Sequence, residues 1–281
     1  MFDYLICDEF AFMDEQAWTE VLRATVLVKG KKVLLMSTPK GKNHFYRMWQ
    51  LDGTNLKYKS FSMTSYDNPF IDTQEIEDAR STLPEHVFRQ EYLAEFVDSG
   101  TELFTHLTIN NDAQKTTRLY AGIDLGRADD YTVLTILNES GQMIYCQRWR
   151  HDSWTNIVQK LCYALNEYQP VTFVEVNSVG DAIYEQIKSG YDKTIYPFVT
   201  TSKSKSDIIE SLIVANQNKE FTIQQIDWLL KEFDVFTYQY SAQTRSVKYG
   251  APNGFHDDGI MSCAIAYHGV KHKSKPPFSF Y

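Results

Sequence analysis

The sequence has few cysteines, no long apolar run and no excess of positive charge, and each absence excludes a class of protein. Its four cysteines are scattered without a CxxC pair, which excludes a zinc knuckle or a disulfide framework and indicates a reducing compartment. No apolar run is long enough to cross a bilayer, and the first residues do not form a signal peptide, so we expect no membrane association. The net charge of −8 excludes a protein that coats nucleic acid through bulk charge alone.

What is present is enough apolar material for a packed core. The 281 residues are 43% hydrophobic and 14% aromatic, so one large or two modest domains are expected rather than a disordered chain. Short basic clusters at 29–32, 203–205 and 271–275 interrupt the acidic background. Because basic residues can gather locally, and metal-binding carboxylates add negative charge, an enzyme acting on nucleic acid stays open.

The second half of the chain has the pattern of a mixed α/β sheet. A strand at 118–126 precedes two more strands joined by the turn "NESG", after which strands and helices alternate. Helices are expected at 154–168, 205–217 and 257–269, and the stretch "TTSKSKSD" at 200–207 is expected to be a flexible loop. The other strands are expected at 131–137, 142–149, 171–176 and 194–199, and in "FDVFTYQY" and "TRSVKYG".

Carboxylates occur in this half where a strand or helix is otherwise apolar. Asp124 and Glu175 interrupt two strands, and Asp257 and Asp258 open the last helix. A buried unpaired carboxylate is costly, so each needs a partner. Oxygen ligands without histidine or cysteine favour Mg²⁺ or Mn²⁺ over zinc, and two such ions about 4 Å apart can hydrolyse a phosphodiester. Asp130 is either a further ligand or a turn residue, and Asp257 alone is typical of a helix cap.

Three segments in this order resemble the nuclease domain of the large terminase subunits of tailed phages. They are "YAGIDLGRADDYTVLTI", "VTFVEVNSVG" and "GFHDDGIMS". The resemblance implies an RNase H-like nuclease domain over 118–281 that binds two Mg²⁺ or Mn²⁺ ions. Matched one at a time, the metal ligands implied are Asp124, Glu175 and Asp258, with Asp257 as a close second to Asp258.

The first half resembles part of the packaging ATPase of the same family. "YLICDE" has the form of a Walker B strand ending in Asp8 and Glu9, and "LLMSTPKG" resembles the coupling motif with Ser37 and Thr38. We therefore expect 1–98 to be the C-terminal part of a P-loop ATPase domain, followed by a linker at 99–117. The sequence contains no GxxxxGK[ST] loop to hold phosphates, so ATP is expected to bind only if the missing N-terminal part is supplied, and this chain alone is not expected to hydrolyse ATP.

The resemblance also implies partners. These are double-stranded DNA, a portal protein, a small terminase subunit and other copies of the large subunit, in the cytoplasm of a host cell and outside the mature virion. Contacts with DNA should depend on backbone charge rather than base reading. The candidate DNA-binding residues are Lys203, Lys205, Arg245 and Lys248. For the two lysines of 200–207, a solvated segment leading into a helix is an equal alternative.

The predicted function is thus a metal-dependent DNA endonuclease that cuts concatemeric viral DNA during packaging, and two rival functions stay open. "GIDLG" also opens the phosphate loop of actin-like and sugar-kinase ATPases, but the sequence lacks their second Asp-Gly-Gly loop and adenosine-binding Gly pair. The other rival is a non-catalytic module for DNA docking or assembly, in which the acids are structural. Stabilisation by metal that depends on Asp124 would distinguish the nuclease from this module.

Overall fold

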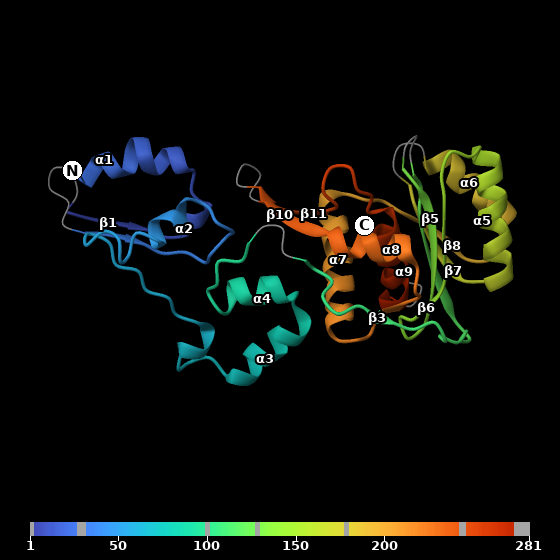
Figure 1. Ribbon diagram of the computed structural model, residues 1–281, viewed down its shortest axis with the longest axis horizontal. Coiled ribbons are helices and arrows are strands. Elements are labelled where there is room, and N and C mark those ends of the chain that lie inside the picture. Colours follow the sequence, from blue (N-terminus) through green and yellow to red (C-terminus); the bar gives the residue numbers. More distant parts are fainter. Residues whose placement is uncertain are drawn as a thin grey trace, which may run out of the picture. The chain divides into compact units, whose positions relative to one another are not determined.

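The computed structural model divides into two compact units, each with its own core (Figure 1). Unit 1 comprises residues 1–101 and 238–248, and unit 2 comprises 102–237 and 249–281. The residues that the structure describes are 3–26, 32–98, 102–126, 130–176, 180–241 and 246–272.

A five-stranded mixed sheet forms the centre of unit 2. Its strands are β4 (Leu119–Asp124), β5 (Thr132–Asn138), β6 (Met143–Trp149), β7 (Val171–Glu175) and β8 (Ile195–Phe198). They lie in the order β6-β5-β4-β7-β8, with β6, β5 and β4 antiparallel and β4, β7 and β8 parallel. The predicted fold class, a mixed α/β sheet in which three paired strands precede strand–helix alternation, is confirmed.

Helices cover both faces of this sheet (Figure 1). One face carries α5 (Trp154–Tyr168) and α6 (Gly180–Gly190), and the other carries α9 (Asp258–His272), against which α7 (Ser202–Gln217) and α8 (Asp227–Val235) pack. Because side chains alternate along a strand, the odd-numbered residues of β4, such as Ile123, join the core with α5 and α6. The even-numbered residues of β4 therefore face α9.

Helix α9 lies unusually close to β4. A Cβ atom added at Gly122 would lie 2.2 Å from the Ser262 carbonyl oxygen and 2.4 Å from the Ala266 nitrogen, so only glycine fits at this crossing. The Ser262 hydroxyl donates a hydrogen bond of 2.9 Å to the carbonyl oxygen of Gly122. These contacts fix the position of α9 across the centre of the sheet.

Two expectations for the chain between β8 and α9 are wrong. The stretch 200–207 is not a loop, because α7 begins at Ser202, with the Thr201 hydroxyl accepting a 3.1 Å hydrogen bond from the Ser204 amide. "FDVFTYQY" is not a continuous strand, because its first residues end α8. The following strands, β10 (Thr237–Ser241) and β11 (Ser246–Gly250), pair with each other.

The stretch from 102 to 117, most of the predicted linker, contains one short strand. β3 (Thr108–Ile109) pairs in parallel with β9 (Thr222–Ile223). Within unit 2, the Asn216 side chain also donates a hydrogen bond of 3.2 Å to the carbonyl oxygen of Thr105. This part of the chain is therefore attached to unit 2 by backbone and side-chain hydrogen bonds.

Unit 1 contains a two-stranded parallel sheet with short helices. The strands are β1 (Tyr4–Cys7) and β2 (Lys32–Leu35), and Cys7 lies opposite Leu35. The helical segments are Phe10–Phe12, Ala17–Leu22, α1 (Arg23–Val26), α2 (His44–Trp49), Ser65–Asp67, α3 (Thr73–Thr82) and α4 (Glu85–Glu91).

The core of unit 1 is small. Phe10 is fully buried, and its ring packs edge-on against Trp18 and His44, with centroid distances of 5.4 and 4.8 Å. Several strand residues are exposed, including Tyr4 and Ile6 of β1 and Leu34 of β2.

None of the helices in the described residues has the length and apolar character that a membrane crossing requires.

Candidate metal centre

The register of β4 and β7 places two carboxylates side by side. Ile123 lies opposite Val174 in the parallel pair, and Asp124 and Glu175 are the next residues on the two strands. Phe173 contacts the α9 face, since its ring lies within 3.1 Å of a Cβ added at Gly269. Glu175 follows Phe173 by two residues, as Asp124 follows Gly122, so both acids belong to the face that α9 covers.

The first turn of α9 brings the third acid to the same place. Gly122 contacts Ser262, and Asp258 precedes Ser262 by four residues, which is about one helical turn. Asp258 therefore lies beyond Gly122 in the direction of Asp124. Asp257 directly precedes the helix, and the charges of both aspartates act on Asp124. The structure thus brings Asp124, Glu175, Asp257 and Asp258 near one another, and their role as metal ligands stays a prediction.

Burial and mutual repulsion make these carboxyl groups electrostatically unusual. Asp124 is 7% exposed, and burial, a hydrogen bond with Glu175 and the charge of Glu175 raise its pKa well above the ordinary value. Burial also raises the pKa of Asp258 to about 6, and the charges of Asp130 and Asp257 act in the same direction. Carboxylates that repel one another in a buried site would be stabilised by a cation, so this donor set fits a hard divalent metal.

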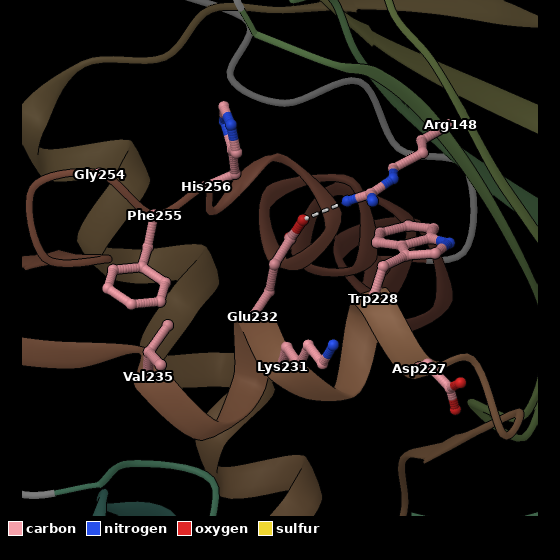
Figure 2. Close-up of a pocket in the computed structure, with 9 residues that line it drawn as sticks. All are labelled: Arg148, Asp227, Trp228, Lys231, Glu232, Val235, Gly254, Phe255 and His256. Carbon is pink, nitrogen blue, oxygen red and sulfur yellow. Dashed lines mark hydrogen bonds and ion pairs between the residues drawn. The ribbon is translucent and has the colours of Figure 1, made fainter.

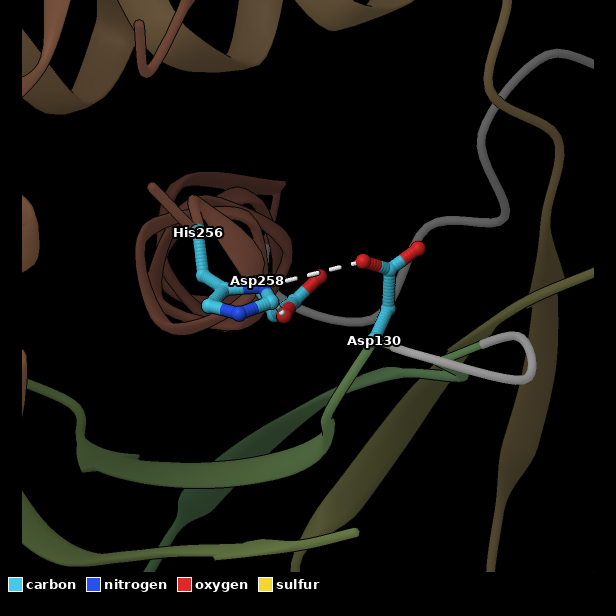
Figure 3. Close-up of side chains that lie close together, drawn as sticks. All are labelled: Asp130, His256 and Asp258. Carbon is cyan, nitrogen blue, oxygen red and sulfur yellow. Dashed lines mark ion pairs between the residues drawn. The ribbon is translucent and has the colours of Figure 1, made fainter. Parts of the chain in front are cut away.

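A second group of candidate ligands includes Asp258 (Figure 3). Nδ1 of His256 lies 3.5 Å from Oδ2 of Asp258 and 3.6 Å from Oδ1 of Asp130. One ligating atom from each of the three residues lies within 4.8 Å of the others. Asp130 is thus brought to the centre, although its side chain is exposed. His256 thus lies beside two of the acidic residues, as a neighbour of Asp258 and Asp130.

Tyr131 and Glu232 support the centre through backbone hydrogen bonds. The Tyr131 amide donates to Oδ2 of Asp258 at 3.0 Å, and the Gly259 amide donates to Oε2 of Glu232 at 2.8 Å. Burial raises the pKa of Glu232 to about 8, and the charges of Asp258 and Asp257 add to this, while the Gly259 bond and Arg148 oppose it. Glu232 thus caps the start of α9 from another helix.

Sequence reasoning did not identify Glu232. Glu232 is one of two charged residues in the otherwise apolar stretch "WLLKEF", and this stretch runs into the strand that was expected in "FDVFTYQY". No other feature of the sequence distinguishes Glu232. Arg148 was missed as well. Its guanidinium lies 3.5 Å from Oε1 of Glu232 and stacks on Tyr131 and Trp228, with its central carbon 4.1 and 4.3 Å from the ring centroids.

One of the four predicted DNA-binding residues lies at the centre. Nζ of Lys205 is 2.9 Å from Oδ2 of Asp257, so Lys205 compensates the acid that does not enter the second ligand group. Lys203 is exposed in the first turn of α7, and Lys248 is exposed on β11. Arg245 lies outside the described residues.

The residues predicted as an ATP-site remnant lie at the ends of β1 and β2. The Ser37 hydroxyl donates to Oε2 of Glu9 at 3.4 Å, and the Glu9 amide donates to Oδ1 of Asp8 at 3.0 Å. Asp8 and Glu9 are exposed, and Thr38 is half-buried. The parallel pairing thus brings the two motifs together, and their role in ATP binding stays a prediction.

Comparison with known sequences identifies relatives along most of the chain. Residues 1–111 match the family described as "Terminase large subunit, T4likevirus-type, N-terminal". The terminase large subunit of Thermus virus P23-45 is 28% identical over 298 aligned residues, which cover 94% of this chain. The chain spans 61% of the length of that relative.

Solved structures give the same fold. The large terminase nuclease from thermophilic phage G20c, in a crystal structure with bound magnesium, superposes with a TM-score of 0.52 at 22% identity. That match covers 60% of this chain and 95% of the nuclease. A large terminase from a second thermophilic bacteriophage superposes with a TM-score of 0.59 at 14% identity, covering 94% of this chain and 69% of the other.

Proposed function

We propose that this chain is a metal-dependent endonuclease that cuts viral DNA during genome packaging, because it resembles phage terminase large subunits along both of its units. One observation carries the proposal. Asp124, Glu175 and Asp258 converge from two neighbouring parallel strands and the start of the helix that crosses them, and the pKa values of Asp124 and Asp258 are raised. The G20c nuclease, which has the same fold, has been crystallised with bound magnesium.

The carboxylates would hold two divalent cations, Mg²⁺ or Mn²⁺. Such ions supply the Lewis acidity that activates a water and stabilises the leaving oxygen of a phosphodiester. Asp124 would hold the ions together with Glu175 of β7 and Asp258 of α9, whose charges both act on it. Asp130 and His256 extend the donor set on the side of Asp258.

The residues around the carboxylates would hold them in place and balance their charge. The Tyr131 amide orients Asp258, and Glu232 anchors the first turn of the helix that carries it. Lys205 neutralises Asp257, and we propose that it approaches a DNA phosphate, with Lys203, Arg245 and Lys248 as further contacts to the DNA backbone. The preferred ligand of the pair is therefore Asp258, with Asp257 held by Lys205.

The resemblance to terminase large subunits also suggests a substrate, partners and a role for unit 1. We propose that double-stranded DNA is the substrate and that a portal protein, a small terminase subunit and further copies of the large subunit are partners. We also assign unit 1 to the ATP-dependent part of the packaging motor, with Asp8, Glu9, Ser37 and Thr38 facing the nucleotide. The match of residues 1–111 to the N-terminal terminase family supports this assignment.

A plasmid-cleavage assay tests the proposed nuclease. The purified chain is incubated with supercoiled plasmid in Mg²⁺, Mn²⁺ or EDTA, beside Asp124→Asn and Glu175→Gln. Glu139→Gln is the matched control, since this exposed glutamate lies in the turn between β5 and β6. Cleavage that requires metal, persists in the control and disappears in both site variants supports the nuclease.

Other outcomes assign the carboxylates a different role. Cleavage that survives in both site variants would rule out these residues as the catalytic ligands. A folded wild-type chain that binds DNA with either metal, yet cuts none, would instead favour a non-catalytic docking module.

A further inference from the structure

A cavity of about 360 Å³ opens beside the candidate metal centre (Figure 2). It lies between α8, the end of β6 and the loop that leads into α9, and His256 belongs to its lining. The same histidine places its Nδ1 3.5 Å from Asp258. The cavity therefore adjoins Asp258, which is not itself part of the lining.

Flat side chains form two of its walls. Trp228 and Phe255 lie on opposite sides of Glu232 in Figure 2. The Arg148 guanidinium stacks on Trp228, which extends the flat surface on that side. Phe255 is 58% exposed, so its ring is accessible to a ligand. Aromatic rings and a stacked guanidinium are the surfaces on which proteins hold nucleobases.

The charges around the cavity differ in their availability. Arg148 is paired with Glu232 at 3.5 Å, and Glu232 is in turn bonded to the Gly259 amide, so these groups are structurally engaged. Lys231 is exposed on α8 and forms no ion pair with any other described residue. Its ammonium is therefore available for a phosphate at the rim.

From this arrangement we propose that the cavity binds one unpaired nucleotide of the DNA strand, next to the phosphate at the metal centre. The base would stack against Trp228 and Phe255, and Lys231 would contact the backbone. The volume is at the lower end of the range for small-molecule sites, which suits a single base and not a base pair. This inference rests on the proposed nuclease function and adds a preference to it: DNA that is frayed or single-stranded beside the cut.

The proposal is tested by DNA binding in EDTA, so that the result does not depend on cleavage. Fluorescence anisotropy compares a duplex that carries a short unpaired thymidine segment with a fully paired duplex of the same length. Stacking of a base on an aromatic side chain contributes about 1–3 kcal/mol, so the unpaired segment should improve affinity between about 5-fold and 150-fold.

Four variants should separate the contributions. Phe255→Ala, at an exposed loop position, and Trp228→Leu should each reduce the preference for the unpaired segment, while Trp228→Phe should retain it. Lys231→Gln should weaken binding to both substrates and lower the slope of log K against log salt by about 1. Trp49→Leu is the control, because Trp49 is 40% exposed in unit 1 and should leave all values unchanged.

Two results would overturn the inference. Equal affinity of the wild-type chain for both substrates would do so, and if plasmid cleavage still depends on Asp124, the nuclease function stands without it. A preference that survives in Phe255→Ala and in Trp228→Leu would place the unpaired nucleotide elsewhere. Failure of the wild-type chain both to bind any DNA and to cut plasmid would instead remove the nuclease function together with this site.

Discussion

Both units contain parallel strand pairs of similar composition, but they differ in burial. All six residues of β4 in unit 2 are buried, whereas three of the four residues of β2 in unit 1 are exposed. Parallel strands are normally covered on both faces, as the strands of unit 2 are by its helices. The comparison shows what a covered sheet permits: a carboxylate at the end of β4 is buried beside others, while Asp8 and Glu9 at the end of β1 remain in solvent.

The largest contrast should come from one matched pair of substitutions. Ile123→Ala in β4 removes a fully buried side chain and should lower the free energy of unfolding by about 2–5 kcal/mol. Ile6→Ala in β1 alters a side chain that is 64% exposed and should cost less than about 0.5 kcal/mol. Urea unfolding monitored by hydrogen exchange gives both values in the same chain. A loss of several kcal/mol for Ile6→Ala would mean that β1 is covered in solution.

A divalent cation should stabilise unit 2 and leave unit 1 unchanged. At a metal concentration one hundred times the Kd, binding adds about 2.7 kcal/mol to the stability of the unit that holds the site. Asp124→Asn removes a buried carboxylate beside Glu175, so this variant should be more stable than wild type in EDTA and should lose the response to metal. Hydrogen exchange with and without Mg²⁺ locates the effect. Equal protection of peptides from both units would contradict this prediction.

Mild acid should weaken unit 1 through His86. Burial lowers the pKa of this histidine to about 4, so between pH 6.5 and pH 4 the unfolded state binds more protons and stability falls as the pH falls. At pH 5.5 the loss relative to neutral pH is about 1.2 kcal/mol. His86→Phe keeps a ring against Tyr238 and should flatten the pH dependence of exchange in unit 1.

His268 provides the corresponding test in unit 2. Burial lowers its pKa to about 4 as well, with His272 and Lys271 adding to the effect. His268→Phe should remove the loss of stability that this histidine causes in unit 2 on acidification, and should leave the acid response of unit 1 as in wild type. If either substitution changes the acid response of both units alike, the two units do not respond separately.

Helix caps should cost the same in both units, because capping is a local interaction. Asp72 caps α3 in unit 1 by accepting from the Gln74 amide at 2.9 Å, and Ser153 caps α5 in unit 2 by accepting from the Asn156 amide at 3.2 Å. Asp72→Ala and Ser153→Ala should each cost about 1 kcal/mol. Denaturant unfolding measures both, and a cost several times larger in one unit would show that its cap also has a tertiary role.

Helices and strands with strong periodicity in the sequence were predicted close to their observed positions. The strands β5 and β6 and the helix α5 lie where alternation, the "NESG" turn and helical spacing placed them, because their local preferences agree with their burial. The grouping of Asp124, Glu175 and Asp258 as metal ligands came from a family resemblance, and it stays a prediction. Without that resemblance, the sequence pattern identified only acidic residues within apolar strands and at the start of an apolar helix.

The misses have identifiable causes. α8 is short, and its aromatic residues continue into β10, so the two elements look like one strand. The start of α7 depends on a reciprocal Thr201–Ser204 cap within a Ser/Lys-rich stretch that is otherwise typical of a loop. The contact of His256 with Asp130 needs a tertiary arrangement that no local pattern contains.

The crossing of α9 over Gly122 also determines when the centre can exist. Ser262 and Gly122 are 140 residues apart in the chain, and Asp258 reaches Tyr131 only across 127 residues. Contacts of such long sequence separation form late in folding, because the loop must be closed before they can stabilise anything. While the protein is being synthesised, Asp124 and Glu175 therefore lack their third carboxylate until α9 has docked. Because α9 is synthesised after the strands of the sheet, the centre stays incomplete until the sheet beneath it has formed.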